Sequence, residues 1–334
     1  MPLFLSITLI ILISYVFTRL ANRLHFSSVI GLIVAGLILA IPPIRSLVVA
    51  GHKEMFGGLA NIGLVTLMFL AGFEVSWNMI IKERRGALVI TLFTVATSLF
   101  LGFVVFTVLG FKISTSLIMG ICFGITAESV KARVLMQMGK IRTRLGSLLM
   151  GTGIINDIIG VFMLILVAYF FTDNNISMEE VWLLGGMLAA FFIGIFVHCL
   201  FNRENRHLKR LENILLATIV PFLFVNIGLN FDLSSFRVDI PILVLVITTA
   251  TVGQILGVFL TRPITRLSWS QLWLVGWGMN AKGAVELAIA YIAMTVGILP
   301  SNLYSALVVT TLVTTTMFQV VIFRMVKRDP EIMN

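Results

Sequence analysis

Residues 126–160, TAESVKARVLMQMGKIRTRLGSLLMGTGIINDIIG, place charged and amide side chains inside two otherwise apolar segments. Asp157 stands about twelve residues into its segment, and at about 1.5 Å per residue this depth is close to the centre of a bilayer. A lone carboxylate in hydrocarbon costs several kcal/mol, so it is rare there unless it lines a polar cavity or serves transport. Asp157 is therefore the first candidate for a functional residue.

The composition indicates a membrane protein. The chain has 334 residues, of which 59% are hydrophobic and 12% charged, and its mean hydropathy is +1.06. A soluble domain carries about 25% charged residues, so this chain cannot cover itself with a water-facing surface. The net charge of +9 does not indicate nucleic-acid binding, because Lys and Arg fall in short breaks between apolar runs and not in one stripe or tail.

We expect an all-α polytopic membrane protein with about eleven transmembrane helices joined by short connections. A single membrane domain over residues 1–334 is expected, without a soluble regulatory domain. The expected segments are residues 3–19, 28–44, 57–79, 86–109, 114–138, 146–171, 180–201, 212–230, 238–260, 271–297 and 302–324.

The basic residues predict the orientation. Counted in alternate connections, Lys and Arg number 17 on one side of the membrane and 4 on the other. Cytoplasmic loops carry the excess of basic residues. We therefore expect a multi-pass protein of the cell membrane with its N-terminus outside and its C-terminus in the cytoplasm.

Two further segments place polar groups at the depth of Asp157. Residues 126–129 follow an apolar run that begins near residue 114, and Lys282 follows a run that begins near residue 270. Asn156 directly precedes Asp157. One buried polar pair can simply hold two helices together, but a carboxylate, an amide and a lysine at one depth favour a transport site.

Glycines predict that two of these segments are broken. Gly124 precedes the first polar stretch, and Gly278 and Gly283 flank Lys282. Glycine weakens a helix by about 1 kcal/mol, and unwound backbone at membrane depth is tolerated only in a protein interior or a cavity. The two segments enter from opposite sides, which is the pattern of inverted repeats with a site at their interface. The expected repeats are residues 1–171, with an extra N-terminal helix, and residues 180–326, which are shortened.

Other charged residues have simpler interpretations. Glu74 lies near the inner end of its helix, so we expect it at the mouth of a cytoplasmic cavity or paired with a base. Lys131 follows the first break, where its long side chain is expected to snorkel toward the interface or to reach Glu128. Glu286 stands one helical turn after Lys282 and is a candidate partner for it.

These residues resemble a known family, the monovalent cation:proton antiporters, in the branch related to bacterial sodium/proton and potassium-efflux antiporters. LVTLMFLAGFEV resembles the third-helix signature, and residues 126–160 resemble the crossover helix, loop and carboxylate helix in order. VPFLFVNIGLNFDLSSF resembles the start of the second half, and GMNAKGAVELAIA the second crossover helix. The resemblance implies a homodimer whose protomers each have an interface domain and a six-helix core with two crossed discontinuous helices.

By position, the resemblance implies that Asp157 is the exchangeable carboxylate and Asn156 its neighbour. It also implies that residues 126–129 are the unwound crossover and that Lys282 is the basic core residue. Many electrogenic relatives have two adjacent aspartates where this chain has one, and Thr152 stands where a further glutamate is usual in the asparagine-aspartate form. The chain has fewer helices than is usual, as though a hairpin were missing between the seventh and eighth segments.

A proton and a cation are expected to compete for Asp157. Burial favours the neutral form of a carboxyl group, whereas a hard cation such as Na⁺ prefers oxygen ligands. The expected ligands of Na⁺, or of K⁺ as the alternative, are the carboxylate of Asp157, the amide oxygen of Asn156 and a hydroxyl of Thr126 or Ser129. The groups expected to balance charge at the opposed half-helix ends are Glu128, Lys282 and Glu286.

We expect a secondary transporter that exchanges Na⁺, or K⁺, for protons one for one by alternating access, without a cofactor. A cation channel or uniporter is one alternative, and it predicts current without proton counterflow. A transport-impaired, sensor-like family member is the other, and it predicts that Asp157→Asn leaves function intact. No His-Glu metal motif, Gly-x-Ser-x-Gly elbow or phosphate loop supports an enzyme.

Overall fold

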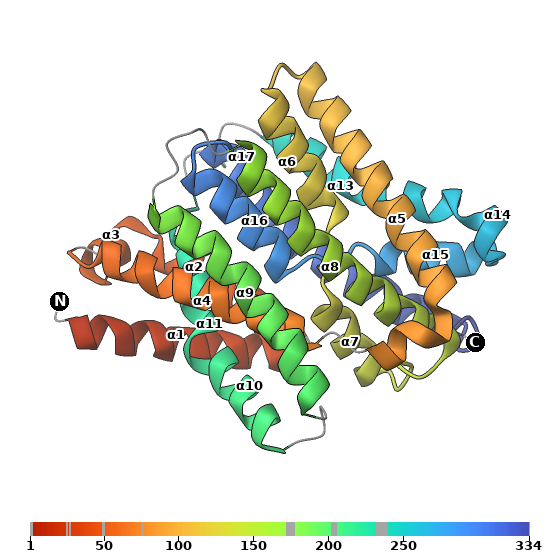
Figure 1. The fold of residues 1–334 in the computed structure, drawn as a ribbon, viewed down its shortest axis with the longest axis horizontal. Helices are drawn as coiled ribbons and strands as arrows, with labels where there is room; N and C mark the ends of the chain where they lie inside the picture. Colours follow the sequence, from red (N-terminus) through yellow and green to blue (C-terminus); the bar gives the residue numbers. More distant parts are fainter. Residues whose placement is uncertain are drawn as a thin grey trace. The chain divides into compact units, whose positions relative to one another are not determined.

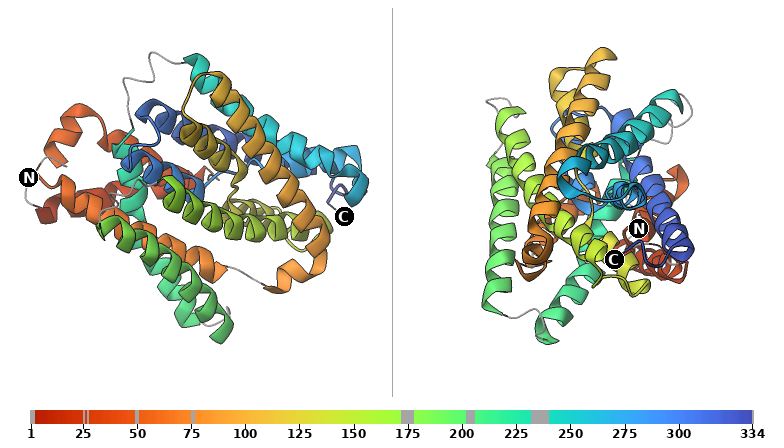
Figure 2. Two further views of the ribbon diagram at one scale, coloured as in Figure 1. Left: turned by 45° about the horizontal axis from the view of Figure 1, so that its top comes forward. Right: turned by 90° about the vertical axis from the view of Figure 1, so that its right-hand side faces the viewer.

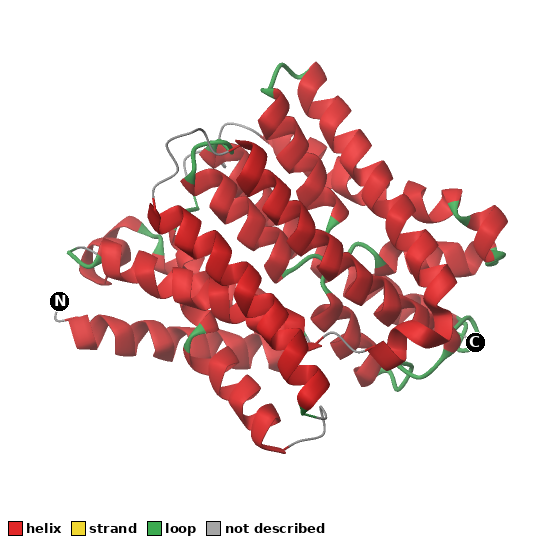
Figure 3. Ribbon diagram, in the orientation of Figure 1, coloured by secondary structure: helices red, strands yellow, loops and turns green. Residues whose placement is uncertain are grey.

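The computed structural model describes residues 3–24, 26, 28–48, 51–74, 77–171, 178–201, 206–231 and 240–333. All regular structure within these residues is helical (Figure 3). Over the described ranges, seven helices are long and apolar enough to cross a membrane, and one bent helix pair and three shorter apolar helices accompany them. Together they correspond to the eleven predicted segments and confirm the all-α polytopic fold.

The chain divides into two compact units, each built from two stretches of sequence. Met1–Val75 and Asp173–Asp232 form the first, and Ser76–Thr172 and Leu233–Asn334 form the second. The first unit contains α1 (Leu3–Arg23), α2 (Ser28–Leu39), α3 (Pro42–Val48), α4 (Lys53–Glu74), α9 (Met178–Leu200), α10 (Arg206–Thr218) and α11 (Val220–Leu229).

Close helix pairs hold the first unit together. α4 packs along α9, and α2 packs along α11 (Figures 1 and 2). At the α4–α9 contact two glycines face the opposing backbone: a Cβ added at Gly72 would lie 2.0 Å from the carbonyl oxygen of Phe191, and one at Gly194 would lie 2.1 Å from that of Phe69. Small residues let membrane helices approach at backbone distance, where van der Waals packing replaces the missing hydrophobic drive.

Prolines accompany breaks in two of the predicted spans, one of which is sharply bent. The segment predicted over residues 28–44 ends as a helix at Leu39, and α3 begins at Pro42 with a bend of 91°. Proline disfavours a helical conformation in the residue before it and cannot donate to the preceding turn. Pro221 likewise separates α10 from α11. The segment predicted over residues 28–44 is therefore present as a bent pair of helices.

The second unit holds the predicted site. Its helices pack around α5, which contacts α6, α8 and α13, and a cluster of buried aliphatic side chains forms its core. The helices are α5 (Trp77–Val108), α6 (Ile113–Gly124), α7 (Glu128–Gln137), α8 (Arg144–Phe171), α13 (Ile240–Leu260), α14 (Arg262–Thr265), α15 (Trp269–Gly278), α16 (Ala284–Thr295) and α17 (Ser301–Arg328).

Two spans of the second unit are interrupted at glycines. α6 ends at Gly124 and α7 begins at Glu128, with Ile125 and Ala127 in extended conformation. In the second span, α15 ends at Gly278, and α16 begins after Gly283. The first interruption is shorter than expected, because Glu128 and Ser129 belong to α7. The expectation that residues 126–129 are all unwound was thus wrong at its C-terminal end.

The glycine contact between α4 and α9 yields a prediction. Gly194→Ala should lower the free energy of unfolding by about 1 to 3 kcal/mol, because the added methyl group has no space against the α4 backbone. The matched control is Gly186→Ala in the same helix, where a Cβ meets nothing within 4 Å. It should be neutral or stabilising by up to about 1 kcal/mol. Thermal unfolding of the purified variants in detergent measures both effects, and equal melting temperatures would contradict the packing argument.

Candidate functional site

The two interruptions touch each other at backbone level. The amide N–H of Ala127 donates to the carbonyl oxygen of Ala281 over 2.7 Å. A Cβ added at Gly283 would lie 2.4 Å from Cβ of Ala127, so only glycine fits there. The unwound stretches therefore meet within the second unit, where a backbone donor of the first pairs with a backbone acceptor of the second.

Lys282 caps the end of α6. Its Nζ donates to the carbonyl oxygens of Cys122, Phe123 and Ile125 at 3.0, 2.6 and 3.0 Å. Cys122 and Phe123 lie in the last turn of α6 and Ile125 directly follows it. At such an end a helix leaves its acceptors unpaired and carries the negative end of its dipole. A cation at this point is stabilising on both counts. Lys282 is 1% exposed.

The backbone of Lys282 is held as firmly as its side chain. The hydroxyl of Thr315 in α17 donates to the Lys282 carbonyl oxygen at 2.9 Å and accepts from the Lys282 N–H at 3.2 Å. The carboxylate of Glu286 lies 3.9 Å from Nζ, and both side chains are buried. Lys282 therefore supplies the charge that compensates the buried Glu286 carboxylate.

Gln254 completes the cap at the end of α6, and this role was not predicted from the sequence. Its Nε2 reaches from α13 to the carbonyl oxygens of Phe123 and Gly124 at 2.6 and 3.1 Å, and the residue is fully buried. The available signal was an amide in the middle of an otherwise apolar segment, IPILVLVITTATVGQILGVFL. A buried amide in a membrane helix indicates an interhelical hydrogen bond, but not with which helix.

Asn156 ties α8 to the same interruption. Its Oδ1 accepts from the backbone N–H of Thr126 at 2.9 Å, and its Nδ2 donates to the carbonyl oxygen of Gly124 at 3.0 Å. One contact needs an acceptor and the other a donor, so an amide fits and an ionised carboxylate would face a carbonyl oxygen. Asn156 is therefore a structural bridge, and Oδ1 keeps one lone pair for a further ligand.

Asp157 follows Asn156 in α8 and is 5% exposed. Gly153, one turn earlier on the same helix, makes room for Glu128, since a Cβ added there would meet the Glu128 side chain at 2.9 Å. Glu128 begins α7 and is 4% exposed. The start of α7 thus packs against the turn of α8 that precedes Asp157, and two carboxylates lie in this part of the unit.

The remaining residues singled out in the sequence are Thr126, Lys131, Ser129 and Glu74. Thr126 is buried, and its hydroxyl accepts from Nζ of Lys131 at 2.8 Å. Lys131 is itself 0% exposed, so of the two expectations the snorkelling one was wrong, whereas the charge of Glu128 does act on Lys131. Ser129 and Glu74 belong to α7 and α4, but their side chains lie outside the described residues.

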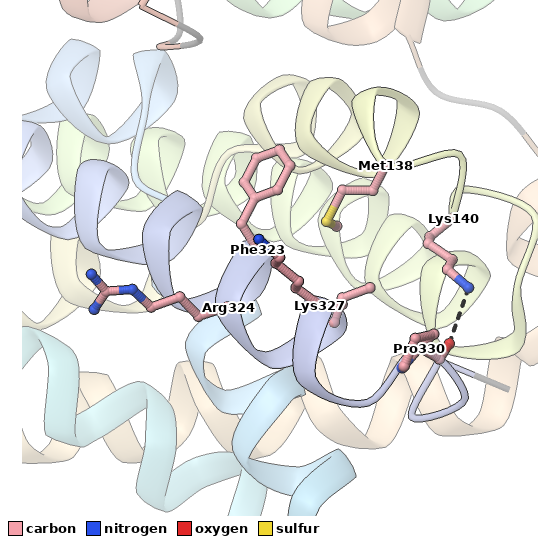
Figure 4. A pocket seen from close by; sticks show the side chains of 7 residues that line it. Met138, Lys140, Phe323, Arg324, Lys327 and Pro330 are labelled. Atoms are coloured by element: carbon pink, nitrogen blue, oxygen red, sulfur yellow. Dashed lines mark hydrogen bonds between the residues drawn. The ribbon is translucent and has the colours of Figure 1, made fainter.

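A separate pocket lies at the far end of α17. It has a volume of about 440 Å³ and combines three basic side chains with an apolar wall (Figure 4). Nζ of Lys140 donates to the carbonyl oxygen of Pro330 at 3.0 Å beside it. No residue of the crossing lines this pocket, which consists of Met138, Lys140, Phe323, Arg324, Val326, Lys327 and Pro330.

Two crossed, interrupted helices around a buried carboxylate define the class as a secondary-transporter fold. Comparison with known proteins is more specific. The profile of the family described as "Sodium/hydrogen exchanger, transmembrane" matches residues 7–210 and 179–328. The chain therefore belongs to the sodium/hydrogen exchanger family.

Individual relatives have low sequence identity, but their alignments cover nearly the whole chain. The Na(+)/H(+)-K(+) antiporter GerN of Bacillus cereus is 22% identical over 364 residues, which cover 93% of each protein. A Na(+)/H(+) antiporter of Enterococcus hirae is 21% identical and covers 92% of this chain and 94% of its own. The structure of the sodium proton antiporter MjNhaP1 from Methanocaldococcus jannaschii superimposes with a TM-score of 0.64 at 15% identity, over 97% of this chain and 96% of that one.

The cap on α6 yields a stability prediction. Lys282→Met should lower the free energy of unfolding by about 3 to 5 kcal/mol, because it leaves buried carbonyl oxygens and Glu286 without their cation. The matched control is Lys327→Met at an exposed position of α17, which should change stability by no more than about 0.5 kcal/mol. Thermal unfolding in detergent compares the two, and an unchanged melting temperature for Lys282→Met would refute the capping role.

Proposed function

We propose that this protein exchanges a monovalent cation for protons at Asp157 by alternating access, with Na⁺ as the first candidate and K⁺ as the second. The observation that carries the proposal is the position of Asp157, buried and adjacent to the residue that bridges to the interruption of α6 and α7. The printed names of the two bacterial relatives, which include Na⁺ and H⁺ and in one case K⁺, support the same substrate class.

The chemistry is a competition for one carboxylate. In the proton-loaded state the Asp157 carboxyl group is neutral, as a desolvated environment favours. Loss of the proton to one side exposes an anionic oxygen that a hard cation can bind with help from an amide oxygen, backbone carbonyls or water. Because one carboxylate cannot hold both at once, alternation between the two sides of the membrane couples cation and proton movement.

The exchange is proposed to be electroneutral. Position 156 holds an amide whose donor and acceptor are both used by the α6–α7 interruption, so it adds no second proton-carrying carboxylate. Lys282 donates to three carbonyl oxygens, which supports a fixed structural charge in place of one that cycles. One carboxylate then carries one proton or one cation per cycle.

The proposal extends to the location, assembly and orientation of the protein. We place the protein in the cell membrane as a homodimer, with the N-terminus outside and the C-terminus in the cytoplasm. The 17-to-4 division of basic residues between the two sides supports this orientation.

Loss of the carboxylate tests the proposed site. Asp157→Asn should reduce Na⁺-driven proton flux in proteoliposomes to the level of protein-free vesicles, since an amide carries neither a proton nor a charge to exchange. The control is Asp329→Asn, an exposed position after α17, which should retain wild-type flux. Full flux in Asp157→Asn would end the proposal, and cation current without proton movement in the wild type would favour a channel.

The stoichiometry has its own test. Initial rates of Na⁺-driven proton flux should be the same at zero membrane potential and at a potential set with K⁺ and valinomycin, because an electroneutral cycle moves no net charge. A several-fold change in rate with potential would show that a second charge cycles.

A further inference from the structure

Lys131 places a second buried ammonium group within the second unit. It lies in the first turns of α7 and is 0% exposed. Its Nζ donates to the hydroxyl of Thr126 at 2.8 Å and lies 3.6 Å from the sulfur of Met279. Thr126 is joined through its own N–H to Asn156, so the ammonium is two hydrogen bonds away from the neighbour of Asp157.

Electrostatics connect this ammonium to the carboxylate. The carboxylates of Asp157 and Glu128 attract the Lys131 ammonium, and the like charge of Lys282 repels it. Glu128 packs on Gly153, one turn before Asp157. Lys131 therefore lies among the groups that a transported cation would have to approach.

The two buried lysines differ in what they bind. Lys282 sits on the carbonyl oxygens at the end of α6 and beside Glu286. Lys131 uses a side-chain hydroxyl and touches a thioether, which is a weak acceptor. The hydroxyl of Thr126 is one of the oxygens that suit a hard cation. In this structure an ammonium on the protein itself occupies that oxygen.

We propose that Lys131 is a tethered cation at the exchange site, whose ammonium must swing away from Thr126 before a transported cation can bind beside Asp157. The inference rests on the proposed function, since it concerns the same carboxylate. It makes Lys131 a specificity-determining residue that lowers the affinity for free monovalent cations. A four-carbon side chain with rotatable bonds permits such a displacement without moving the helix.

The experiment measures apparent KM for Na⁺ in proteoliposomes and, separately, the Na⁺ concentration that stabilises the detergent-purified protein against heat. Lys131→Met and Lys131→Gln should lower both concentrations by about tenfold or more, because like charges repel strongly in a poorly polarisable interior. Lys131→Arg keeps the charge and should resemble the wild type. Lys327→Met is the control for a lost surface lysine.

A double variant controls for misfolding caused by the loss of one buried charge without its counter-charge. Glu128→Gln with Lys131→Met removes one charge of each sign, so net charge is unchanged while the hydroxyl of Thr126 is released. It should also bind Na⁺ more tightly than the wild type. If Lys131→Gln behaves like the wild type and only Lys131→Met differs, the lysine is merely a hydrogen-bond donor to Thr126 and the inference is overturned.

The two readouts separate the two proposals. Tighter Na⁺ stabilisation in the Met and Gln variants without flux in any protein would leave the tethered cation standing and would overturn the proposed transport. Unchanged or raised KM and unchanged stabilisation in these variants would overturn the tethered cation while wild-type flux upholds transport. Absence of stabilisation by both Na⁺ and K⁺ in every protein would overturn the tethered cation as well.

Discussion

The structure of the second unit depends on one constraint, the need to pair backbone groups where a helix stops inside the membrane. α6 ends at Gly124, and its last carbonyl oxygens would each cost several kcal/mol if left bare in hydrocarbon. Side chains from three other helical spans meet this need: Lys282 beside α16, Gln254 of α13 and Asn156 of α8. The interruption can exist only where these three converge, so they determine where Asp157 lies.

This arrangement gives several polar residues structural roles next to Asp157, the proposed exchange residue. Asn156 needs both an acceptor and a donor, which explains an amide at this position without reference to transport. Lys282 neutralises a helix end and a buried glutamate at once. Asn156 and Lys282 are thus engaged in holding the interruption of α6 and α7 together, next to the buried Asp157.

The glycines at positions 124, 278 and 283 were sufficient signals for the interruptions, because they act on local backbone stability. The exact extent of the first interruption was not predictable, since Glu128 gains from lying in the first turn of α7, where a helix favours negative charge. The sequence could not choose between the two expectations for Lys131, for a different reason. Its side chain is long enough to reach either water or the interior, and the choice depends on Thr126 and on carboxylates brought in by packing.

The sequence by itself determined the membrane class and the eleven segments, and it predicted a common depth for Asp157, Lys282 and residues 126–129. These are local quantities, set by hydrophobicity and by a constant rise per residue along a helix. Only the tertiary structure decided which of these groups meet. Thr126 binds Asn156 across 30 positions and Lys282 binds Cys122 across 160. Such partners depend on which helices cross, and a pattern along one helix carries no information about that crossing.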